Sequence, residues 1–178
     1  ASMSVVSLQQ VISRNVDPHS HAVVTVGLMQ SGTARNVIAE SAHFSGTVRT
    51  LDNSVRTSVK RRIHETILGC ASACGVEASV DYREELPVLV NSHEMCDIAA
   101  RAVRGTLRDH YVREIKPSMA GDDFALYSER IPGCYIFMGA TPNGQEVTPL
   151  HSPEFNPDER VIPMAAALLA HTCWEMVK

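Results

Sequence analysis

Three short polar stretches contain the side chains that could carry chemistry. They read RNVIAE with GTVRT, SMAGDDFALY, and PLHSPEF, and their candidate residues are Asn36, Arg49, Asp122, Asp123 and His151. A neutral imidazole is a common ligand of zinc-like ions, and carboxylates bind the same metals. An arginine guanidinium can hold a carboxylate through two parallel hydrogen bonds. The chemistry available is therefore metal binding and recognition of an anionic group.

Each candidate also has a simpler explanation. Asn36 follows a glycine-containing turn, and Arg49 on the polar face of a strand is ordinarily just solvated. Asp122 and Asp123 precede a short apolar pattern and could cap a helix. A single histidine such as His151 is more often a loop residue than a ligand. Taken one at a time, these residues favour the structural explanation.

Other motifs fail when their spacing is checked. His64 and His93 are each followed by glutamate, but Leu68 and Asp97 stand where the second histidine of an HExxH zinc motif must be. The chain contains no GxSxG, Walker or GxGxxG motif.

The elements that must position the candidates begin with a helix-strand-strand-helix-strand series. Apolar residues recur at helical spacing near the start, and β-branched runs then indicate two strands. A cluster of capping residues opens a long helix that ends at Gly75, and an alternating stretch follows it. Cys70 and Cys74 continue the apolar stripe of that helix and are expected in the core. The predicted ranges are residues 5–12, 22–29, 41–51, 55–74 and 77–82.

This order is a split β-α-β arrangement, the ferredoxin-like two-layer fold, without its first strand. In the second predicted strand, even positions such as Phe44 and Val48 are apolar, so Arg49 is expected to point away from the core.

The pattern changes after residue 91, which predicts domains at 1–91 and 92–178. Ser92 is expected to cap a helix with Met95, Ile98, Ala99, Ala102 and Val103 inward, followed by a polar loop to Lys116. A short buried strand is predicted at 135–138. A terminal helix carrying Val161, Met164, Leu168, Leu169 and Cys173 is predicted to open near residues 156–159, with a kink or restart at Pro163.

Composition narrows the class of partner. The chain has 178 residues, 44% hydrophobic content and a net charge of -4, with no basic run typical of nucleic-acid or membrane-surface binding. A small-molecule partner fits better, and neither nucleic acid nor membrane is expected. Five irregularly spaced cysteines favour reduced thiols, and no export signal is visible, so we expect a cytoplasmic protein.

Six motifs carry a resemblance to a known family. In order they are SLQQVISRNVDP, AVVTVG, RNVIAESAHFSGTVRTLD, AGDDF, PGCYIFMGA and PLHSPEFNPDE. Together they resemble the C-terminal half of the N-acyl-amino-acid amidohydrolases, which include hippurate hydrolase, indole-acetyl-amino-acid hydrolase and aminoacylase-like metallopeptidases. The resemblance implies that residues 1–91 form a lid and dimerisation domain. Residues 92–178 would then be the C-terminal part of an α/β metallopeptidase catalytic domain.

The resemblance also assigns roles to single residues. His151 matches the last metal ligand, and Asn36 and Arg49 match lid residues that reach toward the substrate. Asp122 and Asp123 match an acidic pair near the metal site, which is usually Glu-Asp. The implied cofactor is a pair of divalent ions, with zinc, manganese, cobalt and nickel all compatible. The implied substrate is an N-acyl amino acid, cleaved at its amide bond by metal-activated water, and the implied assembly is a homodimer through the lid.

Other functional motifs of the family have no match in this chain. The Cys-His motif, the Glu-Glu motif with the general base and a further histidine ligand belong to the family's N-terminal half, and Glu84-Glu85 lies at the end of the last predicted lid strand. We therefore expect the chain to be incomplete and inactive alone. The alternative is a noncatalytic dimerisation or binding module built on the lid.

Overall fold

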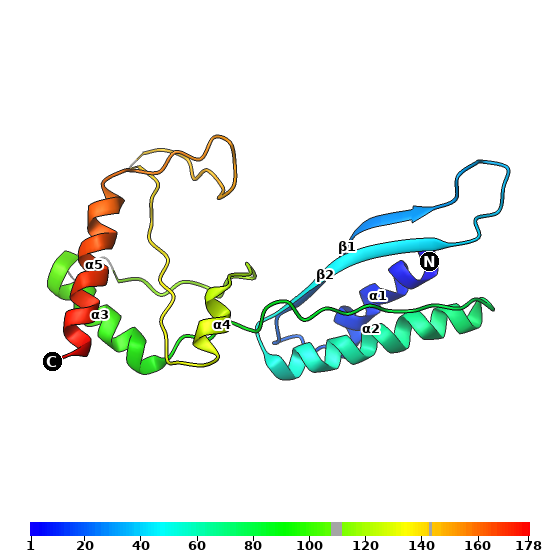
Figure 1. The fold of residues 1–178 in the computed structure, drawn as a ribbon, viewed down its shortest axis with the longest axis horizontal. Helices are drawn as coiled ribbons and strands as arrows, with labels where there is room; N and C mark the ends of the chain where they lie inside the picture. The colour runs from blue at the N-terminus through cyan, green and yellow to red at the C-terminus, as the bar shows by residue number, and fades with distance from the viewer. Residues whose placement is uncertain (108–111, 143) are drawn as a thin grey trace. The chain divides into compact units, whose positions relative to one another are not determined.

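The computed structural model describes residues 1–107, 112–142 and 144–178. They divide into two compact units, each built around its own elements (Figure 1). Unit 1 comprises Ala1–Val88 with Pro117–Asp122, and unit 2 comprises Leu89–Lys116 with Asp123–Lys178. The division into functional domains at 1–91 and 92–178 stays a prediction.

Unit 1 places two helices against a two-stranded antiparallel sheet. Its elements are α1 (Ser2–Asn15), β1 (Ala22–Ser31), β2 (Ala42–Thr50) and α2 (Asn53–Ala73). The register pairs Val24 with Val48 and shifts between Val26 and Leu28. At this bulge the strands approach so closely that a Cβ on Gly46 would lie 2.0 Å from the Thr25 carbonyl oxygen. Only glycine fits opposite the bulge.

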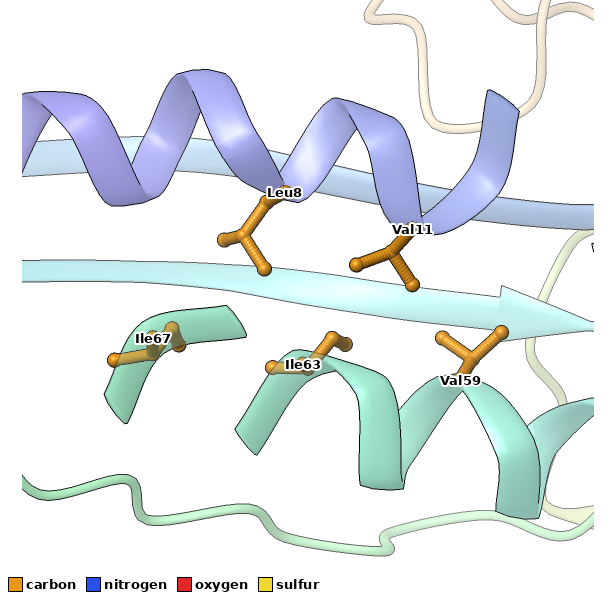
Figure 2. Packing of buried hydrophobic residues seen from close by; sticks show 5 residues of the cluster. All are labelled: Leu8, Val11, Val59, Ile63 and Ile67. Carbon is orange, nitrogen blue, oxygen red and sulfur yellow. The ribbon is translucent and has the colours of Figure 1, made fainter. Parts of the chain in front are cut away.

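The core of unit 1 forms where α1, α2 and the sheet meet. Figure 2 shows Leu8 and Val11 of α1 facing Val59, Ile63 and Ile67 of α2. All five side chains are buried, as the helical spacing of apolar residues predicts. Half-buried strand side chains complete this core, namely Ala22, Val24, Val26, Phe44 and Val48.

The ends of α2 follow the predicted signals. Asp52 accepts hydrogen bonds from the backbone N–H groups of Ser54 (2.7 Å) and Val55 (3.0 Å). At the other end Gly75 has a φ of 65°, and the Val76 N–H donates to the Ala71 carbonyl at 3.0 Å. A left-handed glycine with this bond is a common helix terminus. The core prediction for Cys74 is wrong: the side chain is exposed, while Cys70 is half-buried.

The predicted strand at 77–82 does not form in the described chain, where the sheet contains β1 and β2. The segment is non-helical and unpaired in the sheet, although Val80 and Tyr82 pack against the core of unit 1. A strand forms only when a neighbouring strand exchanges backbone hydrogen bonds with it. In the described sheet β1 and β2 pair with each other, and neither pairs with residues 77–82.

Unit 2 is built mainly on helices. Its elements are α3 (His93–Leu107), α4 (Phe124–Ser128) and α5 (Val161–Met176), and α3 packs against α5. Of the predicted inward residues of α3, Ile98, Ala99 and Ala102 are buried, while Met95 and Val103 are half-buried. Leu168 of α5 is also buried. Leu169 and Cys173, also part of the predicted apolar pattern, are exposed. The polar loop predicted up to Lys116 includes residues 108–111, which lie outside the described residues.

Two details of unit 2 differ from the prediction. Residues 135–138 do not form a strand; instead the Asn91 side chain pairs with the backbone of Tyr135, accepting from its N–H at 2.8 Å and donating to its carbonyl at 3.0 Å. Helix α5 begins at Val161, later than predicted, and Pro163 lies in its first turn. Proline is tolerated there because the first N–H groups of a helix have no intrahelical acceptor.

Among the described residues, no helix has both the length and the apolar character needed to cross a membrane.

Candidate substrate and metal site

Arg49 lies on the exposed face of β2 and contacts a distant part of the sequence. Its neighbour Val48 packs toward the core, so the prediction that Arg49 points away from the core is confirmed. Its Nη1 donates to the Met119 carbonyl at 2.9 Å. A Cβ on Gly121 would lie 3.5 Å from the same nitrogen. The guanidinium therefore lies against the segment that leads into Asp122, with further N–H donors beyond the one used by Met119.

Asn36 lies in the loop that joins β1 to β2. The Ser31 hydroxyl donates to the Ser41 carbonyl at 3.2 Å across the base of this loop, and Gly32 has a φ of 74°. Asn36 itself is exposed, and Ile38, two residues further along the loop, is 97% exposed. An asparagine amide can donate and accept hydrogen bonds, so this loop offers a polar contact next to an apolar one.

The two aspartates have different local roles. Asp123 is at the N-cap position of α4, but its side chain makes no capping hydrogen bond. Its carboxylate is exposed, so the helix-cap explanation does not account for it. Asp122 is half-buried and belongs to unit 1, whereas Asp123 belongs to unit 2. The acidic pair therefore spans the boundary between the units along the chain.

His151 has the most unusual backbone among the described residues. Its φ is 67°, and no other described residue except glycine has a positive φ. The Ser152 N–H donates to the Pro149 carbonyl at 3.2 Å, which makes His151 the third residue of a tight turn. A positive φ at this position normally selects glycine or asparagine. The turn holds an exposed histidine where a residue without a bulky side chain would fit more easily.

The described residues do not form a complete metal centre. Over residues 1–107, 112–142 and 144–178, no group of three or more histidine, cysteine, aspartate or glutamate side chains could hold an ion. A catalytic zinc ion needs three protein ligands. The exposed imidazole of His151 suits a metal as one ligand, and the remaining ligands are not assembled around it in the described chain.

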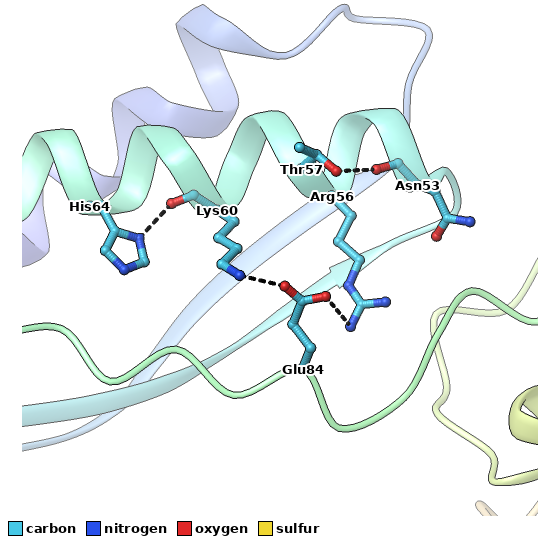
Figure 3. Close-up of polar contacts among 6 residues, drawn as sticks. All are labelled: Asn53, Arg56, Thr57, Lys60, His64 and Glu84. Carbon is cyan, nitrogen blue, oxygen red and sulfur yellow. Dashed lines mark hydrogen bonds and ion pairs between the residues drawn. The ribbon is translucent and has the colours of Figure 1, made fainter.

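Glu84 has a structural role that argues against its being a general base. Figure 3 shows its carboxylate facing α2, where it accepts from Lys60 Nζ at 2.5 Å and lies 3.4 Å from Arg56 Nη2. The hydrogen bond from Lys60 holds the pKa of Glu84 below its ordinary value. A base for catalysis near neutral pH needs a pKa closer to 7. These contacts instead attach the segment containing Glu84 to α2.

The predicted candidates are distributed over both units. Unit 1 contains Asn36, Arg49 and Asp122, and unit 2 contains Asp123 and His151. The sequence reasoning did not anticipate the contact between Arg49 and Met119. Gly121 does not signal this contact, because a Cβ there would lie at an ordinary contact distance of 3.5 Å from the Arg49 guanidinium.

Comparison with known proteins defines the family. Residues 6–175 match the peptidase family M20/M25/M40, and the chain belongs to this family. It is 35% identical over 176 residues to an N-acetyldiaminopimelate deacetylase of Anoxybacillus flavithermus, covering 98% of the chain and 45% of that protein. It is also 35% identical over 175 residues to an N-acetyl-L-cysteine deacetylase of Bacillus subtilis, covering 95% of the chain and 39% of that protein. The chain thus spans less than half the length of these relatives.

Two solved structures also resemble the chain over almost its whole length. A putative aminohydrolase from methicillin-resistant Staphylococcus aureus matches with a TM-score of 0.89 and 28% identity, over 99% of this chain and 46% of its own. A dinuclear metal-binding peptidase of the M20 family from Bacillus subtilis matches with a TM-score of 0.80 and 30% identity, over 99% and 44%. The mixed helix and strand architecture of the chain is therefore that of the M20 peptidase fold.

Proposed function

We propose that the protein is a metal-dependent amidohydrolase that releases an amino acid from an N-acyl conjugate. The observation that carries this proposal is the backbone of His151, whose φ of 67° holds an exposed imidazole in a turn. Unfavourable backbone conformations of this kind concentrate at functional sites, where the side chain must be presented in one direction. Membership in a family with two deacetylase relatives and a dinuclear metal-binding structure supports the same reading.

The proposed roles follow from the chemistry of each side chain. His151 would be one ligand of a divalent metal, zinc or manganese, and Asp122 and Asp123 would be the acidic pair near that metal. Arg49 holds the free carboxylate of the substrate amino acid, and Asn36 adds a hydrogen bond to the substrate. Arg49 suits this role because its guanidinium is exposed and retains donors beyond the one that contacts Met119. None of the residues to which we assign a role is proposed as the general base.

We further propose that the chain is the C-terminal half of such an enzyme. Unit 1 would be the ferredoxin-like lid without its first strand, and it would form a homodimer. Unit 2 would contribute the end of the catalytic domain. The unpaired segment at 77–82 supports the proposal that a strand of the lid is missing. The chain covers 45% of the deacetylase relative, which supports the proposal that catalytic residues are missing. Hippurate-like and indole-acetyl-amino-acid-like conjugates are the proposed substrates, and the cytoplasm is the proposed location.

The first experiment measures bound metal by elemental analysis on protein of confirmed intact mass. We compare the 178-residue chain, the intact protein that contains it, and a His151→Ala variant of each. The matched control is His19→Ala, since the His19 side chain is 97% exposed and makes its ion pair with Asp17. The proposal expects metal in the intact protein that the His151 variant loses and the His19 variant keeps. Metal retained by the His151 variant would refute the ligand assignment.

Measurement of activity tests completeness separately from the metal. We expect no release of amino acid from hippurate or N-acetyl amino acids by the 178-residue chain alone, and release by the intact protein. Hydrolysis by the chain alone, dependent on added metal, would contradict the proposal that catalytic residues are missing. If the chain alone hydrolysed these substrates and its His151→Ala variant did not, the assignment of His151 as a metal ligand would still hold.

An Arg49→Lys variant of the intact protein tests recognition of the carboxylate. Lysine keeps the charge but loses the planar fork of the guanidinium. We expect KM to rise severalfold for N-acyl amino acids, with a smaller change for the matching carboxamides, which lack the anionic group. An equal change for both substrate sets would refute the proposed contact and assign Arg49 a structural role.

A second candidate function, a noncatalytic dimerisation or binding module, has one observation in its favour. Unit 1 contains a core of its own, formed by Leu8, Val11, Val59, Ile63 and Ile67. A monodisperse dimer of the 178-residue chain that unfolds cooperatively and has no hydrolytic activity, even within the intact protein, would favour this alternative.

A further inference from the structure

Two thiols of unit 2 lie in direct contact. Cys96 is in the first turn of α3, Cys134 is in the non-helical segment after Gly133, and their Sγ atoms are 3.5 Å apart although 38 residues separate them in sequence. Both side chains are half-buried. A disulfide requires two sulfur atoms about 2 Å apart, so closing the pair needs a movement of only about 1.5 Å.

Hydrogen bonds on both sides of Cys134 hold this arrangement. The Ser92 N–H donates to the Gly133 carbonyl at 2.9 Å, and the Asn91 side chain pairs with both backbone groups of Tyr135. The Ser92 carbonyl in turn accepts from the Cys96 N–H at 2.9 Å. The residue before Cys134 and the residue after it are thus tied to the chain that enters α3. The proximity of the sulfurs follows from a fixed backbone path.

The other cysteines have different neighbours. Cys70 donates to the Ser7 hydroxyl at 3.5 Å, and Cys74 lies 3.7 Å from the Met3 sulfur. Cys173 is exposed on α5. Simple packing of two half-buried thiols would not require the three hydrogen bonds that Ser92 and Asn91 make with the backbone on either side of Cys134. Within the described residues, the pair on α3 and the 133–135 segment is the arrangement suited to thiol oxidation.

We propose that Cys96 and Cys134 form a redox modification site that closes to an intramolecular disulfide by exchange with a low-molecular-weight disulfide. Cys96 attacks the small disulfide, forming a mixed disulfide and releasing one small thiol. Cys134 then loses its proton and attacks the Cys96 sulfur, which releases the second small thiol and forms the Cys96–Cys134 bond. Two protein thiols are oxidised and one small disulfide is reduced to two thiols.

The order of the steps follows from the environment of Cys134. Burial, together with the hydrogen bond that it shares with Cys96, raises the pKa of the Cys134 thiol to about 12. A thiol with so high a pKa is almost fully protonated near neutral pH and is a slow first nucleophile. Once the mixed disulfide has formed on Cys96, the short distance to Cys134 compensates for its low thiolate fraction. The disulfide would fix the 133–135 segment to the start of α3, and this segment leads along the chain toward His151.

The test uses the 178-residue chain with oxidised glutathione as the probe. After reaction, free thiols are alkylated, the intact mass is measured, and peptides are mapped by mass spectrometry. We expect loss of two hydrogens and one cross-linked peptide pair joining Cys96 to Cys134. Stable glutathione adducts without an internal bond, or five cysteines that all remain alkylated, would overturn the proposal.

Variants separate the pair from the remaining thiols. Cys134→Ser is expected to stop at the mixed disulfide on Cys96, while Cys96→Ser forms neither product at this site. Cys173→Ser is the matched control and retains the internal bond. The wild-type peptide map remains decisive if a variant fails to fold, which circular dichroism would show.

Asn91 provides a test of positioning. Asn91→Ala removes both hydrogen bonds to Tyr135 and is expected to slow conversion of the mixed disulfide to the internal bond severalfold, while formation of the mixed disulfide keeps its rate. Asn91→Asp keeps the acceptor for the Tyr135 N–H and should recover part of the closure rate. Unchanged closure in Asn91→Ala would contradict the geometric argument.

Discussion

His151 combines an exposed imidazole with a backbone that disfavours most side chains. Its φ of 67° lies in the left-handed region, which costs an ordinary residue about 1–2 kcal/mol. Folding alone would favour glycine at this turn. A histidine at this position is consistent with a functional role for its side chain. On this basis we assign His151 as a metal ligand.

This conformation predicts the relative stability of two variants. His151→Gly should be more stable to unfolding than His151→Ala by about 1 kcal/mol, because glycine adopts a positive φ without steric strain. Urea unfolding of both proteins measures the difference. Equal stabilities would mean that the turn relaxes to an ordinary conformation when the imidazole is removed.

Glu84 predicts a pH dependence of stability. Its pKa is lowered from 4.5 chiefly by the hydrogen bond from Lys60, with Arg56 adding to the effect. A carboxylate with a lowered folded-state pKa contributes stability that is fully present above its unfolded pKa and is lost as the pH falls through the folded value. The unfolding free-energy difference between wild type and Glu84→Gln should therefore shrink as the pH is lowered below 4.5.

Urea unfolding at several pH values tests this, with Glu85→Gln as the control that removes the same charge one residue away. A gap between wild type and Glu84→Gln that stays constant with pH would show that the pair with α2 contributes nothing through its charge. The effect should be small because surface ion pairs contribute little.

At the scale of elements, α2 contains the clearest agreement between sequence and structure. Its cap at Asp52, its buried stripe from Val59 to Ile67 and its glycine terminus are all local signals, and all three are observed. Helical periodicity and caps act over a few residues, so they do not depend on the path of the rest of the chain. The apolar periodicity of α1 is a local signal of the same kind, although α1 has no side-chain cap.

Two glycines, Gly69 within α2 and Gly75 just beyond its C-terminus, are predicted to respond to substitution with opposite signs. A Cβ would meet nothing within 4 Å at either Gly69 or Gly75, but Gly75 has a φ of 65° while Gly69 lies within the helix. Gly69→Ala should stabilise unit 1 by about 0.5–1 kcal/mol through helix propensity. Gly75→Ala should destabilise it by about 1 kcal/mol through backbone strain. Thermal or urea unfolding gives both signs, and a shared sign would contradict the helix terminus described here.

Strands were less predictable than helices. The alternation at 77–82 and the apolar run at 135–138 each favour a strand, yet neither pairs in the described chain. A strand is completed only by hydrogen bonds to a neighbour that local sequence does not specify. Tyr135 illustrates the point, because the side chain of Asn91 takes the place of a strand partner.

At the scale of the whole molecule, the proposed homodimer makes a prediction about one surface. In the described sheet β1 pairs with β2 on one side, and Leu28 of β1 is 46% exposed. A strand with an open edge and exposed apolar side chains is suited to association. Leu28→Lys should therefore shift the protein toward monomer in sedimentation equilibrium. Leu126→Lys, at an equally exposed leucine of unit 2, should leave it dimeric.

A monomeric wild type would refute the dimer itself. A dimer insensitive to Leu28→Lys would place the interface elsewhere on the molecule.

The sequence by itself determined the four main elements of unit 1, the helices of unit 2 and, through six ordered motifs, the wider peptidase family, while the hippurate hydrolase subgroup stays a proposal. These follow from periodicity, caps and residue identity, which are local properties. Only the tertiary structure decided the positive φ of His151, the contact of Arg49 with Met119 and the meeting of Cys96 with Cys134. The last two contacts join residues 70 and 38 positions apart, so they depend on the path of the backbone between them. Local patterns constrain which face a side chain occupies, whereas its distant neighbours are set by how the whole unit packs.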